Sequence, residues 1–310
     1  MEVISVKVSL NSENMIKLFT HLSTENISGN LSDGTVSIFV LPINARQFDY
    51  DRVGQHLLES VADYALSNKL KEQYKGHPMT MSKVARERFK EYSKNDGELG
   101  ELLLFCFLEG HLHAPKILTK LEHKTSSEMY VNGSDGIHLL KIDDANYQLI
   151  FGESKMYKTG SEGLKVAFQS VYDFKNEVNN KGNKKSGIRF EKGLISTHLE
   201  NEIINDTNEE IVKMLIYPKH QSSNNIRIAD SFAIFIGFEM DLEEERKELN
   251  DEEFDSAVIE KINNSLKDIK SEIYKLIEKH DLIGHAFYLY FLPFTNIAEN
   301  RKKILGMVLE

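Results

Sequence analysis

Two nearly continuous apolar runs, Ser231–Phe238 and Ala286–Phe294, constrain the fold of this chain more than any other feature. Short apolar runs with no polar side to turn toward water are typical of strands that are covered on both faces. Such strands need packed layers above and below them, and a chain of 310 residues that is 41% hydrophobic can supply that core. We therefore predict that both runs join or back the central sheet of an α/β protein.

Periodicity assigns most of the remaining chain. Alternation with period two and short apolar segments predict four further strands, at Val3–Leu10, Thr35–Leu41, Leu139–Ile142 and Tyr147–Phe151. Apolar residues at helical spacing predict a helix over Arg52–Leu66. We expect a polar helix over Ser82–Tyr92 and further helices over Glu98–Leu108, Glu162–Val178 and Glu252–His280. The segment Glu72–Pro78, which contains Gly and Pro, is typical of a boundary loop.

Three observations bear on the cellular location of the protein. Its apolar runs are far shorter than the roughly 20 residues of a membrane span, so we expect no membrane contact. Glu2 and Lys7 stand in an alternating pattern, unlike the basic and then apolar start of a signal peptide. The only cysteine, Cys106, excludes an intrachain disulfide. Together these observations favour a cytoplasmic protein.

Charge is unevenly distributed along the chain, whose formal net charge is −10. Residues 239–260 hold eleven acidic and two basic residues, whereas residues 155–192 hold nine basic and four acidic residues. Because a local basic stretch matters more for phosphate contacts than the total, a nucleic-acid partner stays open. The acidic run is either a solvated surface or an inhibitory or docking surface that repels DNA until a basic partner masks it.

A candidate site lies between residues 97 and 175. Asp135 enters one predicted strand, and Glu153 and Lys155 end the next. The short turn between these strands predicts antiparallel pairing, so Asp135 should lie near Glu153 and Lys155, whose side chains share one face. Clustered carboxylates repel unless a cation neutralises them, and hard oxygen ligands select Mg²⁺ or Mn²⁺. An ammonium group beside them is suited to orienting water or stabilising a phosphate.

The order of these groups resembles the PD-(D/E)xK nuclease superfamily. That pattern has a helix Glu, a strand Asp, a Glu-x-Lys strand and a following helix, which here are Glu101, Ser134-Asp135, Glu153-Ser154-Lys155 and the helix with Gln169. Ser134 stands in place of the first-position Pro. The segments Gly97–Leu104, Ser134–His138 and Gly152–Lys155 are also similar to the HamA family. That family is the nuclease-like subunit of the Hachiman anti-phage defence system and partners a superfamily 2 helicase called HamB.

The resemblance implies an α/β fold with a PD-(D/E)xK restriction-endonuclease-like core, in which a mixed central sheet is flanked by helices. We expect this nuclease-like domain over residues 81–310, with its motifs at about 97–175, and an N-terminal α/β extension over residues 1–80. The implied activity is metal-dependent hydrolysis of phosphodiester bonds in DNA, held in check and activated by the partner helicase.

The resemblance also implies roles for individual residues. Asp135, Glu153 and the carbonyl of Ser154 would hold Mg²⁺ or Mn²⁺, and Glu101 would join them directly or through water. Lys155 would position the attacking water.

The resemblance also implies that polar groups after the Glu-x-Lys strand would contact DNA. Gln169 would contact the same site or the DNA backbone. The lysines of the basic stretch that we expect to bind DNA are Lys158, Lys165, Lys184 and Lys185.

Several alternatives remain open at this point. Glu98, three residues before Glu101 on the same helix face, competes with it for the metal. His138 falls off the face of Asp135 and is expected to be a packed or supporting group. A zinc site at His111, His113 and His123 has no Cys cluster or His-Glu-x-x-His helix to support it. Finally, the chain could be a catalytically silent adaptor of a helicase complex, or a nuclease of a different system.

Overall fold

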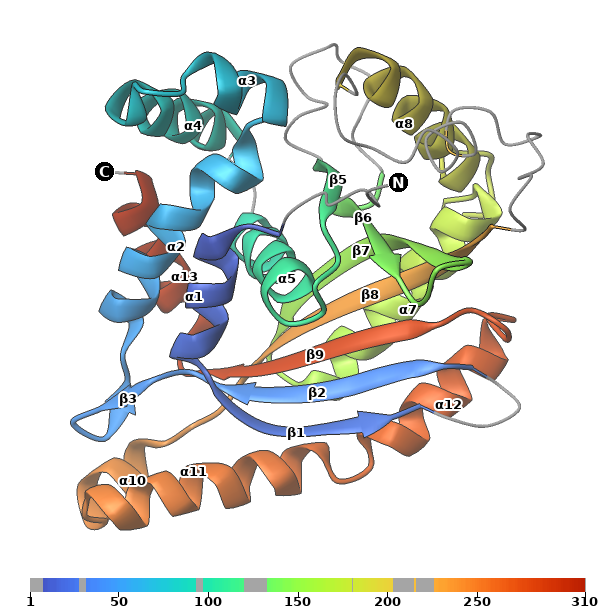
Figure 1. The fold of residues 1–310 in the computed structure, drawn as a ribbon. Helices are drawn as coiled ribbons and strands as arrows, with labels where there is room; N and C mark the ends of the chain where they lie inside the picture. Colours follow the sequence, from blue (N-terminus) through green and yellow to red (C-terminus); the bar gives the residue numbers. More distant parts are fainter. Residues whose placement is uncertain are drawn as a thin grey trace.

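The computed structural model describes residues 8–27, 32–92, 97–119, 133–179, 181–202, 215 and 226–309. In it, seven strands form one mixed sheet in the order β1-β2-β9-β8-β7-β6-β5, and helices lie on both sides of this sheet (Figure 1). The predicted mixed central sheet flanked by helices is therefore confirmed. The strands are β1 (Thr20–Asn26), β2 (Gly34–Val40), β5 (Lys116–Thr119), β6 (Gly136–Lys141), β7 (Asn146–Tyr157), β8 (Arg227–Glu239) and β9 (Phe287–Phe294).

The two apolar runs become β8 and β9 at the centre of the sheet. Strands β2, β9, β8 and β7 are parallel neighbours, and antiparallel pairs extend the sheet at both edges. Every residue of β9 is buried, as expected for a parallel strand covered on both faces. Residues 1–80 contribute β1 and β2 to this same sheet, and a small hairpin of β3 (Ile43–Asn44) and β4 (Gln47–Phe48) follows β2.

Helices α5 and α7 cover opposite faces of the sheet. A side chain at Gly100 of α5 would meet Ser154 of β7, whereas one at Gly163 of α7 would meet Tyr157 and Ile236. Because side chains alternate along a strand, these contacts place α5 and α7 on different faces. The helices on the side of α5 are α1 (Leu10–Leu18), α2 (Tyr50–Ala65), α5 (Glu98–Gly110) and α13 (Ile297–Leu309). On the other side, α7 (Gly160–Asn176) packs against α12 (Ile269–Lys279).

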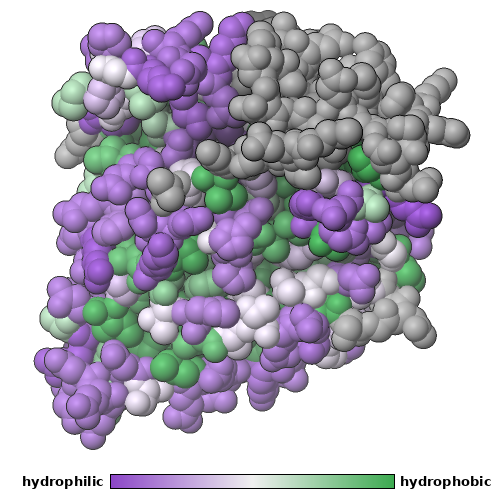
Figure 2. All heavy atoms as spheres, in the orientation of Figure 1, coloured by the Kyte–Doolittle hydropathy of each residue, from purple (hydrophilic) through white to green (hydrophobic). Residues whose placement is uncertain are grey.

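The remaining helices that the structure describes lie at the periphery. They are α3 (Asn68–Gln73), α4 (Pro78–Tyr92), α8 (Ile188–Glu202), α10 (Glu243–Glu248) and α11 (Asp251–Leu266). Most of the acidic run thus becomes α10 and the first part of α11, which lie along the bottom of the molecule, far from α8 (Figure 1). The face in Figure 2 shows hydrophilic side chains along this lower edge.

Three predicted elements differ in the structure. Leu10 begins a helix instead of ending a strand, because Ser9 accepts a hydrogen bond from Ser12 N as a helix N-cap; the first seven residues lie outside the described ones. The long helix predicted for residues 252–280 is two helices that break at Lys267 and Asp268. The apolar stripe continues through this break, so periodicity alone could not place it. Strand β7 runs six residues beyond its predicted end at Phe151.

Among the helices that the structure describes, none combines the length and the apolar character that crossing a membrane requires.

Candidate active site

The predicted pairing of the two motif strands is present. Strands β6 and β7 run antiparallel, with Ile137 opposite Phe151. Just before β6, Asp135 N donates to Gly152 O at 2.8 Å. The buried Asp135 carboxylate then accepts from Ser154 through Oδ2, at 2.7 Å from the main-chain nitrogen and 2.8 Å from Oγ. The start of one motif strand is thereby attached directly to the Glu-Ser-Lys segment of the other.

These hydrogen bonds also orient the carbonyl of Ser154. The N–H and C=O groups of one strand residue point toward the same neighbouring strand. Because the N–H of Ser154 meets Asp135 on the side of β6, the carbonyl of Ser154 points to that side as well. Strand β6 begins only at Gly136, so its ladder does not reach this position. The carbonyl oxygen and the Asp135 carboxylate are therefore on the same edge of β7.

Glu153 and Lys155 form an ion pair within β7. They lie inside this strand and not at its end, with side chains 15% and 25% exposed. Since Ser154 faces α5, strand alternation directs both of them to the face that α7 covers. Burial lowers the pKa of the Lys155 ammonium, but the charge and hydrogen bond of Glu153 and the charge of Asp135 outweigh it, so that this pKa is raised. Lys155 thus interacts electrostatically with both carboxylates, and its side chain is a cation at neutral pH.

Glu101 approaches Asp135 from the side of α5. It is buried, and its Oε2 accepts from the Tyr64 hydroxyl at 3.2 Å. Glu101, Asp135 and Gly152 line a cavity of about 10 Å³, which is close to the space that one water molecule needs. Glu98 is also buried but is not among the described residues that line this cavity. The geometry therefore favours Glu101 over Glu98 as the helix acid that could share a water molecule with Asp135 in this cavity.

His138 lines the same small cavity. It is 1% exposed, and its Nδ1 lies 2.8 Å from the carbonyl oxygen of Ala114. A carbonyl only accepts, so Nδ1 carries a proton. Its burial agrees with the expectation of a packed or supporting group, but it is closer to Asp135 than strand alternation suggested.

The lysines expected to bind DNA are largely gathered in one place. An open groove beside α7 is lined by Lys165, Gln169, Lys184 and Lys185. Gln169 is exposed and donates to Asp173 at 2.8 Å, so it belongs to this groove and does not reach toward Asp135. Lys158 is exposed directly after β7 and is not among the described residues that line the groove.

Two groups near the site were missed from the sequence. The hydroxyl of Tyr64 holds Glu101, and the carboxylate of Glu191 on α8 holds Ser134. These contacts join residues 37 and 57 positions apart. No local pattern could have signalled them, because they arise only when α2 packs against α5 and the first turn of α8 reaches the segment before β6.

The donor set suits a hard divalent cation. Asp135, Glu153 and the Ser154 carbonyl would supply oxygen ligands, and Mg²⁺ is usually bound by one or two carboxylates together with water. Within the described ranges no group of three or more His, Cys, Asp or Glu side chains is already assembled for a metal. Glu153 is paired with Lys155, and Glu101 is bonded to Tyr64, so these carboxylates are satisfied by protein groups.

His111, one of the three histidines considered for zinc, lies in an aromatic cluster. His111 packs edge-on against Phe39 and Tyr290, and its Nδ1 lies 3.3 Å from the Tyr290 hydroxyl. His123 lies outside the described residues.

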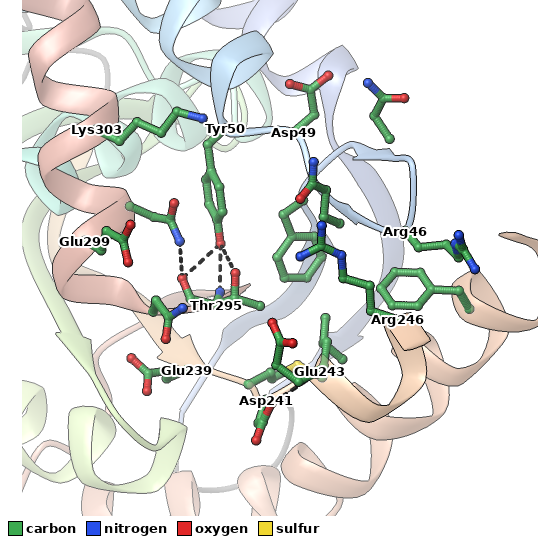
Figure 3. Close-up of a pocket in the computed structure, with 18 of the residues that line it drawn as sticks. Arg46, Asp49, Tyr50, Glu239, Asp241, Glu243, Arg246, Thr295, Glu299 and Lys303 are labelled. Carbon is green, nitrogen blue, oxygen red and sulfur yellow. Dashed lines mark hydrogen bonds between the residues drawn. The ribbon is translucent and has the colours of Figure 1, made fainter. Parts of the chain in front are cut away.

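A larger cavity, of about 500 Å³, lies elsewhere, at the carboxyl ends of β8 and β9 (Figure 3). At its centre the Tyr50 hydroxyl accepts from Thr295 N at 2.7 Å. Its charged groups largely serve the fold: Glu239 caps α13 at Ile297 N, and Lys303 pairs with Asp51. None of the site residues expected from the sequence lines this cavity.

Comparison with known proteins identifies a family. The family model described as HamA matches residues 15–307 of the chain. No match was found among curated proteins or among solved structures.

Proposed function

Because the chain belongs to the HamA family, and so is a component of the Hachiman anti-phage defence system, we propose that it is a metal-dependent DNA nuclease and the effector of that system. The observation that carries this proposal is the position of the Asp135 carboxylate. It is hydrogen-bonded to Ser154, the residue that stands in the sequence between Glu153 and Lys155, and its charge contributes to the raised pKa of Lys155. This is the order of groups that defines a PD-(D/E)xK site, and a mixed sheet supports it.

The residues that would hold Mg²⁺ or Mn²⁺ are Asp135, Glu153 and the carbonyl of Ser154, with Glu101 acting through the small cavity. A divalent cation bound there would supply positive charge for activating water and for polarising the phosphate. The hydrogen bonds from Ser154 keep the Asp135 carboxylate at the edge of β7. Side chains of the protein itself would orient the water and the phosphate.

Lys155 would supply a fixed positive charge. Its raised pKa keeps the ammonium group protonated, so it is suited to orienting a water and to stabilising negative charge that develops on the phosphate. It is not suited to removing a proton in this state. Its present partner, Glu153, would be shared with the cation when the site is loaded.

The open groove beside α7 would receive the DNA backbone. Lys165, Lys184 and Lys185 provide the positive charge there, and Gln169 provides an amide for hydrogen bonding to phosphate. Such contacts position the backbone without reading its sequence. The choice of substrate would therefore depend on whether the DNA is single- or double-stranded more than on its base sequence.

The partner would be a superfamily 2 helicase that holds the nuclease in check. The acidic surface of α10 and α11 is a candidate for its docking, because a block of negative charge attracts a basic partner and repels DNA. It lies far from α8 in the molecule (Figure 1). Deletion of residues 243–253 should weaken helicase binding; unchanged affinity and unchanged basal cleavage would contradict this role.

One observation favours the alternative of a catalytically silent adaptor. Glu101, Asp135 and Glu153 each have a protein partner already, and an adaptor could retain them as a buried network. Such a protein would still bind the helicase or DNA but would not cut.

A plasmid assay separates the two functions. Supercoiled plasmid is incubated with Mg²⁺ or Mn²⁺ and either the wild-type chain or Lys155→Ala, each alone and with the partner helicase and ATP. A nuclease cuts, and the single substitution abolishes cutting while helicase binding persists. If neither protein cuts under any condition and both bind the helicase, the adaptor function holds instead.

A further inference from the structure

The carboxylate of Glu191 accepts two hydrogen bonds from one residue of the candidate site, Ser134. Its Oε1 lies 2.5 Å from Ser134 N, and its Oε2 lies 2.6 Å from Ser134 Oγ. Glu191 is 1% exposed, and Ser134 is buried as well. Burying a carboxylate is unfavourable unless strong hydrogen bonds compensate it, so this contact has a definite structural role.

Ser134 is the residue directly before Asp135. On its other side, Asp135 is held by Gly152 O and by Ser154. The short segment that carries the carboxylate is therefore clamped twice, by β7 on one side and by Glu191 on the other. Charge-assisted hydrogen bonds are strong and directional, which suits them to fixing a backbone segment outside the regular ladder of β6.

The first turn of α8 is itself anchored to the core. Lys192 pairs with Asp230 of β8 at 2.7 Å, and Arg189 N donates to Glu177 at the end of α7 at 3.0 Å. Glu191 N donates to Gly187 O at 3.1 Å. A side chain at Gly187 would come within 2.3 Å of Phe174 O, so the chain passes close to α7 here. Glu191 is thus placed by contacts that do not involve Ser134.

The same turn continues from the loop that carries two groove lysines. Lys185 N donates to Glu177 O at 2.7 Å, and Lys184 bridges to Val178 across the loop. Lys184, Lys185 and Glu191 therefore belong to one short stretch that is hydrogen-bonded to the end of α7. Ser134, which Glu191 holds, and the adjacent Asp135 therefore have a fixed position relative to Lys184 and Lys185.

We propose that Glu191 is a positioning residue that fixes Ser134, and through it the Asp135 carboxylate, relative to β7 and to the lysine groove. The expected effect of Glu191 on metal binding and cleavage rests on the proposed nuclease function, whereas its effect on the position of Asp135 does not. An experiment can therefore contradict the nuclease function without contradicting the positioning role, and the reverse.

Amide hydrogen exchange of the apo protein tests the positioning. The amide of Ser154 is bonded to the Asp135 side chain, so its exchange rate reports whether that carboxylate stays in place. In Glu191→Ala we expect exchange at Ser154 to rise by about 10-fold or more, while the amide of Leu289 in the central strand is unchanged. Glu191→Gln, which can still accept from Ser134, should stay close to wild type. Glu278→Ala, an exposed glutamate of α12, is the matched control.

Mn²⁺ titration and single-turnover cleavage test the consequence. Loss of a group that supports a metal ligand typically costs about 10- to 100-fold in affinity or rate, so Glu191→Ala should lose that much in both. Its affinity for DNA in the absence of metal should stay within about twofold, because the lysines are intact. A merely structural defect would lower DNA binding and cleavage together.

Amide exchange at Ser154 and the activity of the wild-type chain together test the positioning role. Unchanged exchange at Ser154 in a folded Glu191→Ala protein overturns the positioning role. Changed exchange in a chain whose wild type neither binds Mn²⁺ nor cuts DNA supports positioning and overturns the nuclease proposal alone. If Glu191→Ala does not fold, Ser134→Ala removes one of the two bonds from the other side. It should raise exchange at Ser154 by a smaller factor, and no rise would contradict the proposal.

Discussion

The carboxylate of Asp135 accepts two hydrogen bonds from Ser154, one from the main-chain nitrogen at 2.7 Å and one from the hydroxyl at 2.8 Å. The middle residue of the Glu-Ser-Lys motif thereby holds the aspartate of the preceding motif. Its side chain points away from Glu153 and Lys155, toward α5. Ser154 therefore has a role of its own and does more than space the two charged residues.

Ser154→Ala should weaken this hold without removing it. The main-chain bond remains, so we expect the free energy of unfolding to fall by about 1 kcal/mol. Because Asp135 becomes less well oriented, DNA cleavage should fall by about 10-fold. Urea unfolding and single-turnover cleavage measure the two effects. Ser265→Ala, which loses an exposed bond to Lys261 O, is the control and should change neither.

Glu101→Gln and Glu98→Gln distinguish the two helix acids. Both side chains are buried, and both substitutions preserve size, so their effects on folding should be similar. Only Glu101 lines the cavity shared with Asp135, so Glu101→Gln should lower cleavage by about 10-fold or more and Glu98→Gln by less than about twofold. Thermal unfolding of both variants checks their stability. The reverse order of activities would assign the role to Glu98.

The groove lysines should appear in the salt dependence of DNA binding. Replacing Lys184 and Lys185 with Ala removes about two phosphate contacts, so the slope of log affinity against log salt should become shallower by about two. The loss of affinity should be similar for unrelated DNA sequences. The double variant of the exposed Lys69 and Lys302, on α3 and α13, has the same change in net charge. An equal effect of both pairs would argue for general electrostatics and against a groove.

His111 should make stability depend on pH. Burial, then the charges of His21 and His113, lower its pKa to about 4 in the folded chain. The unfolded chain takes up a proton near pH 6.5, which the folded chain does not, so stability is complete above that pH and falls as the pH drops toward 4. We expect this residue to account for a loss of about 1–2 kcal/mol between pH 7 and pH 5.

Urea unfolding at these two pH values measures that loss. His111→Gln should show a smaller decrease than wild type, whatever its stability at pH 7. His77→Gln, at an exposed position between α3 and α4, is the matched control. A decrease in His111→Gln as large as that of wild type would show that other groups cause it.

Local patterns determined a large part of this protein. The runs that became β8 and β9 are short and apolar at nearly every position, which is typical of a strand that is covered on both faces. The short turn at residues 143–146 likewise left only antiparallel pairing for β6 and β7, which brings Asp135 to the Glu-Ser-Lys segment. These features follow from a few neighbouring residues, so the sequence alone was enough to predict them.

Tertiary packing decided the rest. The α5 and α7 helices cover opposite faces of β7, and only this placement puts Glu101 on one side of Asp135 and Lys155 on the other. It also turns Gln169 outward into the lysine groove. Glu191 reaches Ser134 across 57 positions of the chain because the first turn of α8 lies beside the segment that enters β6. Periodicity describes which face of an element is apolar, but it does not contain the identity of the element that will cover that face.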